Sequence, residues 1–415
     1  MLFQRLGVPY GEGQIPLMVP VVLLLLAAGL RSGEFRIAPA RLPALALIWG
    51  TAGVCTLVQL ALGGAPSIFS LGLVVALYAM VAVTANLGPE AVDRVHRVYL
   101  RLMTVFAGVS VAQMVIQYLG VAYRDYLSLI VPDILLLDFY NTGDPIAYGD
   151  SLYRSNGVLF LEPSFLSMFL GLAVALALYR GSGWLQVSVL LVGMVPPLAG
   201  SGFVVLLPAV VALALTGYRR NLLTALPAGI LAVLVATLTP LGERYLERST
   251  EATNPETSSS FRLVQPYTAL LPPSFDDEIP AAIGHGAGTA DNYLISEGLG
   301  AITQPLMPKV LYEYGILGVL GILVVLLFLL LVGVRARPWT AGLLLLYVYV
   351  NASFLQHTQV FLTLFWILML PPLRNRGPAE VSRGEPPAGQ AAGASTAESL
   401  QRVKEPLPAV PPVPR

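Results

Sequence analysis

Three charged side chains stand at the start of long apolar runs in this 415-residue sequence. Glu162 immediately precedes Pro163 and an apolar run, and Lys309 and Glu313 open another. Charges at the edge of an apolar helix are costly unless they are paired or functional. A carboxylate at this position can complement the helix dipole, or it can act as a general base or substrate ligand. The spacing of Lys309 and Glu313 favours a local ion pair or a shared ligand site.

The glycine-rich segment 284–288 is a further candidate for ligand binding. Gly284 and Gly286 flank His285, a pattern that favours a tight turn close to a ligand. The Lys-Ser/Thr that would complete a nucleotide-phosphate loop is missing. The adjacent carboxylates of 276–278 lack spaced partners and are typical of a solvated surface, and the three histidines are too far apart to predict a metal site. We therefore expect neither a metal nor a cofactor.

Helices in lipid have to position these residues. The chain is 56% hydrophobic and only 12% charged, with a mean hydropathy of +0.73, which is typical of a polytopic membrane protein. The alternation of a membrane barrel is absent, so we predict an all-α bundle of about 11 transmembrane helices (range about 10–12). The predicted spans are 15–30, 42–62, 67–86, 98–119, 158–179, 184–200, 203–217, 222–240, 306–332, 340–354 and 358–371.

The order of the basic residues predicts a topology. Arginines occupy every second connection between the predicted spans, and short basic loops stay in the cytoplasm. They are Arg31, Arg36, Arg41, Arg94, Arg97, Arg101, Arg180, Arg219, Arg220, Arg335, Arg337, Arg374, Arg376 and Arg383. The N-terminus is then outside and the C-terminus inside, with two larger outer loops at about 120–157 and 241–305. The first span could instead be a signal peptide, but its basic residues follow the apolar run, which favours an anchor.

The chain divides into two parts by composition. Residues 1–374 form the predicted transmembrane domain, while 375–415 are rich in Pro, Gly and Ala and predict a disordered cytoplasmic tail. The single cysteine, Cys55, lies in an apolar span and predicts a packing residue, so the outer loops have no intrachain disulfide to hold them. Any chemistry must therefore occur in the membrane or in the two outer loops.

Three motifs in order resemble one family. The first is Arg154-x-x-Gly157 followed by Glu162-Pro163-Ser164, and the second is the segment 198–203 around Ser201. The third combines Arg262 and the glycine-rich segment 284–288 with Lys309-x-x-Tyr312-Glu313 and the Tyr-Gly that follows. Over residues 15–372 the chain resembles the O-antigen polymerase and O-antigen ligase-like superfamily of bacterial envelope enzymes, and it is most similar to the exopolysaccharide-repeat polymerases.

This resemblance implies a GT-C-like membrane glycosyltransferase of the bacterial inner membrane that needs no nucleotide-sugar donor. Its substrate would be an oligosaccharide repeat unit on undecaprenyl pyrophosphate, joined to others at the periplasmic face to make exopolysaccharide or O-antigen. Arg154 and Arg262 would hold the pyrophosphate, since guanidinium groups bind phosphate bidentately, and Glu162 would act as the base. Substrate contacts are expected from the remaining candidates, which are Lys309, Glu313, Ser201, Gly284, His285, Gly286 and Tyr312. The implied partners are the lipid-linked substrate, the bilayer and a chain-length regulator or export proteins, without nucleic acid.

Two alternatives remain open at this point. Ligases of the superfamily generally have a functional histidine in the large outer loop, and residues 291–305 contain none, which favours a polymerase over a ligase. A transporter or flippase would also have about eleven helices but would place its charges near the bilayer midplane, often in two related halves. The charges of this chain lie at the ends of the apolar runs, which favours the enzyme.

Overall fold

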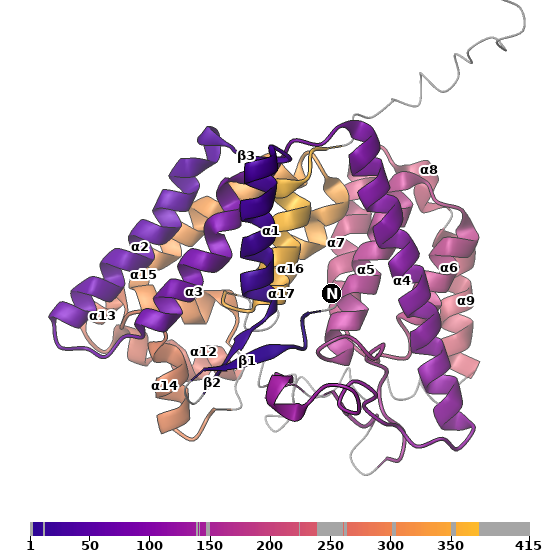
Figure 1. Ribbon diagram of the computed structural model, residues 1–415, viewed down its shortest axis with the longest axis horizontal. Coiled ribbons are helices and arrows are strands. Elements are labelled where there is room, and N and C mark those ends of the chain that lie inside the picture. The colour runs from indigo at the N-terminus through magenta and orange to yellow at the C-terminus, as the bar shows by residue number, and fades with distance from the viewer. Residues whose placement is uncertain are drawn as a thin grey trace, which may run out of the picture. The chain divides into compact units, whose positions relative to one another are not determined.

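Every apolar segment named above coincides with a helix in the computed structural model (Figure 1). The structure describes residues 3–10, 13–137, 140, 142–146, 150–223, 225–238, 260, 264–300, 304–349 and 354–372. The long apolar helices are α1 (Met18–Ser32), α2 (Leu42–Ala61), α3 (Ile68–Tyr78), α4 (Pro89–Tyr118), α5 (Pro163–Arg180), α6 (Trp184–Gly193), α7 (Ser201–Leu215), α9 (Ala225–Leu238), α15 (Leu306–Phe328), α16 (Ala341–Tyr349) and α17 (His357–Leu364).

Within the described residues, four of these helical stretches are long and apolar enough to cross a membrane. They are Pro39–Ala61, Pro89–Tyr118, Pro163–Arg180 and Leu306–Val334. The other apolar helices are shorter than the about 20 residues that a bilayer requires. A mostly helical chain with several apolar helices is compatible with a helical membrane protein. The count of about eleven spans and the GT-C-like architecture stay predictions, as does the orientation of the termini.

The short basic connections come together at one end of the bundle, which we call the basic end. There β3 (Phe35–Ile37) pairs antiparallel with β4 (Val83–Ala85). Arg180 at the end of α5 lies 2.6 Å from Asp93 near the start of α4. A cluster of aromatic rings joins the remaining elements at this end, and it includes His96, Tyr99, Tyr179, Trp339 and Trp366.

The longer connections come together at the opposite end, which we call the loop end (Figure 1). It contains a hairpin of β1 (Gly7–Tyr10) and β2 (Gly13–Pro16), and the short helices α12 (Gln265–Leu270), α13 (Glu278–Ile283) and α14 (Thr289–Ser296). The Gln14 side chain donates to the Leu136 carbonyl at 2.8 Å, and the Ser67 amide donates to the Ala287 carbonyl at 2.7 Å. The sequence predicted the helices well but gave no sign of this hairpin or of the pairing of β3 with β4.

Helix α5 is the central helix of the described part, with 94% of its apolar window buried. It packs so closely against α7 that a Cβ atom added to Gly171 would lie only 2.3 Å from the Gly202 carbonyl oxygen. Small residues let membrane helices approach in this way. Pro163 occupies the first turn of α5, where its missing N–H leaves no helical hydrogen bond unmade. The start of α5, with Glu162 before it, is therefore held rigidly at the loop end.

Helix α15 is broken at Gly315, the tenth of its 23 residues. Gly315 has φ 60° and ψ −160°, so the first turns of α15 are separated from the apolar stretch that follows. At the other end α15 continues into a π-helical segment, Leu329–Val334, which packs against a second one, Phe365–Met369, at the end of α17. Cys55 is fully buried beside the break at Gly315, with its Sγ 3.7 Å from the Tyr314 carbonyl oxygen, and is a packing residue as predicted.

Candidate functional site

The first turns of α15, which we call the α15 mouth, contain Lys309, which is almost fully buried. Its Nζ donates to Asp291 at 2.7 Å and to Gln304 at 2.8 Å, and it lies 3.2 Å from Glu313 Oε1. Lys309 therefore donates hydrogen bonds to Asp291 and Gln304, while its contact with Glu313 is an ion pair, because neither carboxylate oxygen of Glu313 has a hydrogen-bond partner in the described part of the chain. Glu313 is completely buried. The predicted pair of Lys309 and Glu313 is therefore present, and it belongs to a network that the sequence did not predict.

The glycine-rich segment forms the predicted tight turn against α15. Gly284, Gly286 and Gly288 all have positive φ values of 72°, 91° and 73°. The amide of His285 donates to the Tyr312 carbonyl at 2.9 Å, and that of Gly286 donates to the Glu313 carbonyl at 2.8 Å. In an unbroken helix these two carbonyls would accept from residues 316 and 317. The break at Gly315 leaves them to the turn instead.

Aromatic rings cover this turn. The imidazole of His285 stacks on Tyr312 with centroids 4.3 Å apart, and Tyr312 stacks on Tyr293 at 5.3 Å. His285 Nδ1 also lies 3.1 Å from the Tyr312 carbonyl oxygen. Four of the predicted substrate contacts, which are Gly284, His285, Gly286 and Tyr312, are thus brought together with Lys309 and Glu313.

The start of α5 with Glu162 before it, which we call the α5 mouth, contains a second group of predicted residues. Ser164 Oγ donates to Glu162 Oε2 at 3.0 Å, and Ser201 Oγ donates to the Ser164 carbonyl at 2.5 Å. The Glu162 side chain is only half-buried, and it makes no capping hydrogen bond to the described amides of the first turn of α5. Its carboxylate is therefore more accessible than that of Glu313, and it does not serve as a hydrogen-bonded helix cap.

Arginine residues near this mouth are paired with aspartates. Arg154 forms an ion pair with Asp144, and the Arg154 amide donates to the Asp144 carbonyl at 2.9 Å. Arg5 binds Asp125 through both carboxylate oxygens. Burial alone would raise the pKa of Asp125, but the hydrogen bonds and charge of Arg5 hold that pKa below its usual value. Arg262 lies outside the described residues, so the predicted pairing of Arg154 with Arg262 around one phosphate stays a prediction.

The start of α17 lies beside the α15 mouth, while Tyr140 packs at the α5 mouth with its ring centroid 6.5 Å from that of Phe165. Gln356 caps α17, because its Oε1 accepts from the Gln359 amide at 2.9 Å. Phe354, two residues earlier, packs on Tyr314 with centroids 5.7 Å apart, and Tyr314 directly follows the buried Glu313.

Helix α17 also has an unusual buried polar face. Gln356, Gln359 and Thr363 recur at helical spacing, and all three are more than nine-tenths buried, as is the neighbouring His357. Within the described residues, Gln359 Oε1, Thr363 Oγ1 and His357 Nε2 have no hydrogen-bond partner. Polar groups in this position mark pathways or sites in membrane proteins. Sequence reasoning considered His357 only as a metal ligand and missed this face, although its three-and-four spacing was readable.

The charges of the α15 mouth limit what it can bind. One cation, Lys309, stands against the two carboxylates of Asp291 and Glu313, so this network attracts no anion by itself. The acidic run of 276–278 is exposed, as predicted. Among the described residues, no group of three or more His, Cys, Asp or Glu side chains is placed to hold a metal ion.

Comparison with known proteins adds no neighbour to this geometry. No protein-family model, no curated protein and no solved structure matches the chain.

Proposed function

We propose that this protein polymerises oligosaccharide repeat units linked to undecaprenyl pyrophosphate, producing exopolysaccharide or O-antigen. The reaction takes place at the periplasmic face of the bacterial inner membrane, which the loop end faces, with the N-terminus outside and the C-terminus in the cytoplasm. The bilayer, the lipid-linked unit and a chain-length regulator or export proteins are its partners. The proposal rests on the resemblance of the motifs and on the physical arguments that follow.

One observation supports this proposal most directly. The two charged helix mouths, at Glu162 and at Lys309 with Glu313, both lie at the loop end, at the starts of α5 and α15. An enzyme that acts on a lipid headgroup needs its polar residues at one membrane boundary. The apolar helices that begin at the two mouths would face the lipid tail in the hydrocarbon region of the bilayer.

The reaction is a glycosyl transfer with a pyrophosphate leaving group. The acceptor hydroxyl oxygen bonds to the anomeric carbon of the growing chain while the bond from that carbon to the pyrophosphate oxygen breaks. The bonding electron pair leaves with the pyrophosphate, and the hydroxyl proton passes to the carboxylate of Glu162. Guanidinium groups of Arg154 and Arg262 stabilise the charge that builds up on the pyrophosphate.

The residues of the α15 mouth have a different role in this proposal. Because Lys309 is buried and is paired with Asp291, Gln304 and Glu313, it stabilises the first turns of α15 instead of binding phosphate. The half-buried ring of His285, which stacks on the buried Tyr312, then offers one face to a sugar of the substrate, since aromatic faces pack against apolar faces of ligands.

Purified protein incubated with a lipid-linked repeat unit tests the proposal. A ladder of products of increasing length is the expected result, and the ladder should be lost in Arg154→Ala while protein yield is kept. Asp144→Asn is the matched control, since it removes the partner of Arg154 and leaves the guanidinium in place. Transfer of a finished chain to a glycolipid acceptor, without a ladder, would indicate the ligase alternative.

A transporter or flippase remains the second candidate because of one observation. The buried polar face of α17 at Gln359 and Thr363 lies one and two turns inside the helix, where a polymerase acting at the boundary has no use for it. Cells that lack the protein decide between the two functions. Single lipid-linked units should accumulate on the outer leaflet if the protein is a polymerase, and on the inner leaflet if it is a flippase.

A further inference from the structure

The backbone just before α5 is strained. Within the part of the chain that the structure describes, only two non-glycine residues have a positive φ, Val158 at 69° and Leu198 at 47°. A β-branched residue avoids this region because its Cβ substituents crowd the backbone. Val158 lies four residues before Glu162, and Leu198 lies three residues before Ser201. Both strained residues therefore border the α5 mouth.

Gln113 of α4 holds the turn that contains Val158. Its Oε1 accepts from the Ser155 hydroxyl at 2.7 Å and from the Gly157 amide at 3.1 Å. Its Nε2 donates to Asn156 Oδ1 at 3.2 Å, and that same oxygen accepts from the Val158 amide at 3.0 Å. Gln113, Ser155 and Asn156 are all more than nine-tenths buried. One buried side chain thus matches the polar groups of three consecutive residues.

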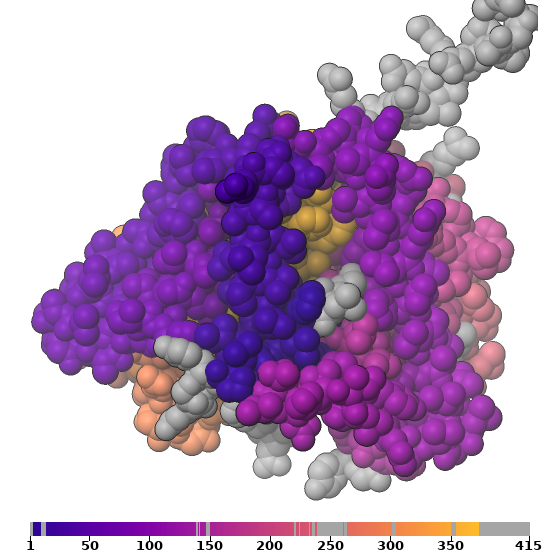
Figure 2. All heavy atoms as spheres, in the orientation of Figure 1, coloured from indigo at the N-terminus to yellow at the C-terminus, as the bar shows by residue number. Residues whose placement is uncertain are grey.

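The N-terminal segment holds the same turn through its carbonyl groups. Arg5 Nη1 donates to the Val158 carbonyl at 2.9 Å, and Gln4 Nε2 donates to the Leu159 carbonyl at 3.3 Å. Arg5 is itself fixed by Asp125. Figure 2 shows the indigo N-terminal segment lying directly against the magenta segment that follows α4. Strained backbone persists only where surrounding contacts enforce it, and it is typical of functional sites.

A short and buried segment joins this turn to Glu162. The side chain of Phe160 is fully buried, and its ring packs against Phe106 and Phe169, with centroids 5.1 Å and 5.3 Å apart. Helix α5 begins directly after Glu162. Because the chain is fixed on both sides of Glu162, the place of its carboxylate depends on the turn at Val158.

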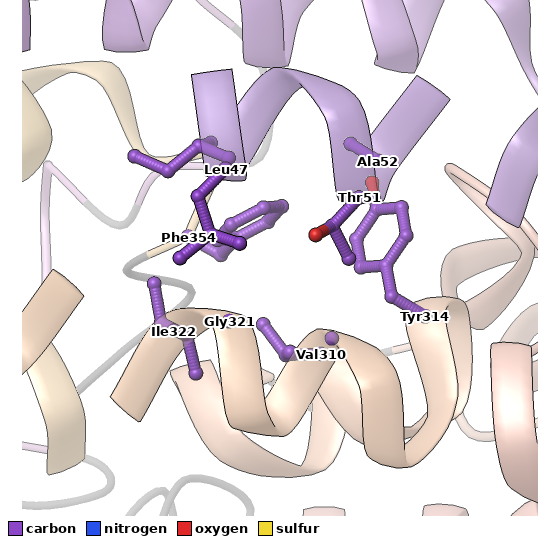
Figure 3. Close-up of a pocket in the computed structure, with 10 residues that line it drawn as sticks. Leu47, Thr51, Ala52, Val310, Tyr314, Gly321, Ile322 and Phe354 are labelled. Atoms are coloured by element: carbon purple, nitrogen blue, oxygen red, sulfur yellow. The ribbon is translucent and has the colours of Figure 1, made fainter. Parts of the chain in front are cut away.

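The small groove between α2 and α15 differs from the α5 mouth (Figure 3). It encloses about 30 Å³, which is room for only about two water molecules. Its lining is apolar apart from Thr51 and Tyr314, and the non-glycine residues of the lining all have ordinary φ values. The backbone strain of the described chain is thus concentrated beside the α5 mouth.

We infer that Gln113 is a positioning residue, which holds the strained turn at Val158 and so places the carboxylate of Glu162 against the acceptor hydroxyl. The inference rests on the proposed function for the role of Glu162 as the base, while the holding of the turn rests on the hydrogen bonds alone. A general base works only within hydrogen-bond reach of the proton that it takes, and a displacement of about 1 Å can lower a rate about 100-fold. Gln113 therefore acts through Glu162 and does not touch the substrate.

The rate of ladder formation in single and double variants tests this role. Gln113→Met keeps the length of the side chain and removes its three hydrogen bonds, so kcat should fall at least about tenfold, while KM for the lipid-linked unit should change less than about twofold. In a Glu162→Gln background the same change should not lower the residual kcat further, because a positioning residue acts through the group that it places.

Ser110→Ala is the matched control for this series. Ser110 is buried on α4 about one turn before Gln113, and its hydroxyl donates to the Gly193 carbonyl at 2.9 Å. The variant therefore loses a buried hydrogen bond of α4 that does not reach the strained turn. Its kcat should equal that of the unchanged protein.

Hydrogen exchange tests the holding of the turn without any activity. The amides of residues 155–160 should exchange at least about tenfold faster in Gln113→Met than in the unchanged protein, whereas Ser110→Ala should leave their exchange as it is. Asn156→Ala removes the acceptor of the Val158 amide and should give the same faster exchange and lower kcat, so it replaces Gln113→Met if that variant folds poorly.

Three results would overturn the inference. They are unchanged exchange in Gln113→Met, an equal fall of kcat when Gln113→Met is added to Glu162→Gln, and a loss of kcat in Ser110→Ala as large as that in Gln113→Met. Faster exchange in Gln113→Met, together with an unchanged protein that forms no ladder from lipid-linked units, would overturn the proposed function and leave the holding of the turn by Gln113 standing.

Discussion

The two helix mouths at the loop end accommodate charged side chains at the start of an apolar helix in different ways. At α15 the charges of Lys309 and Glu313 are buried and form an ion pair, and Lys309 also donates to Asp291 of α14 and to Gln304. At α5 the carboxylate of Glu162 is half-buried and has a serine hydroxyl as a neighbour. A buried and compensated charge network specifies a structure, whereas an accessible carboxylate can exchange a proton with a substrate. The comparison therefore predicts a structural role for the α15 mouth and, under the proposed function, a chemical role for the α5 mouth.

Replacing Lys309 tests this division with the largest expected effect. Lys309→Met leaves the fully buried carboxylate of Glu313 without a cation, which should lower the free energy of unfolding by about 3–5 kcal/mol. Thermal unfolding of the purified protein measures this change. The double variant Lys309→Met with Glu313→Gln should recover much of the loss. A stable single variant that has lost only activity would place chemistry at α15 and break the comparison.

The matching change at α5 should act on catalysis instead of stability. Glu162→Gln keeps the shape and the contact with Ser164 but removes the base, so the rate of ladder formation should fall at least about 100-fold. Its unfolding curve should overlay that of the unchanged protein. Near-normal ladder formation would mean that Glu162 only stabilises the dipole of α5 and that another residue is the general base.

An ion pair near α5 gives a pH-dependent comparison. The pKa of Asp125 is lower in the folded protein than its usual value because Arg5 outweighs the effect of burial. The stability from this pair is therefore present above the unfolded-state pKa of about 4 and is lost as the pH falls through the lower folded-state pKa. Asp125→Asn should cost about 2 kcal/mol at neutral pH. Unfolding scans between neutral and acidic pH should show a smaller acid loss in this variant.

The polar face of α17 should give the smallest effect, with an informative sign. Thr363→Val removes a buried hydroxyl that has no partner in the described part of the chain, so stability should rise by about 1 kcal/mol. Gln359→Leu should act in the same direction. Thermal unfolding with the lipid-linked unit absent measures both. A loss of stability would mean that these groups are hydrogen-bonded to ordered water or to a ligand in the membrane.

The sequence predicted helix positions better than contacts, and particular residues explain why. Pro163 and the apolar runs determine helices locally, so the starts of α5 and α15 could be read directly. The spacing of Lys309 and Glu313 and the alternating glycines of 284–288 likewise predicted a pair and a turn that the structure contains. Asp291, Gln304 and Gln356 could not be predicted, because their roles depend on chain segments brought together only by folding. Val310, Gly318 and Gly321 look like ordinary helix residues in the sequence, because only the fold shows that they face α2.

The basic end places a limit on how the molecule can move. Arg337 donates to the carbonyls of Ile367, at 2.9 Å, and of Leu370. Arg41 donates at 2.9 Å to the carbonyls of Val83 and Leu368. Both guanidinium groups thus grip the last turns that follow α17, where the helix dipole is negative. Rocking this element between inward-open and outward-open states would break three such bonds together, those to Ile367, Leu368 and Leu370, so these arginines oppose that movement.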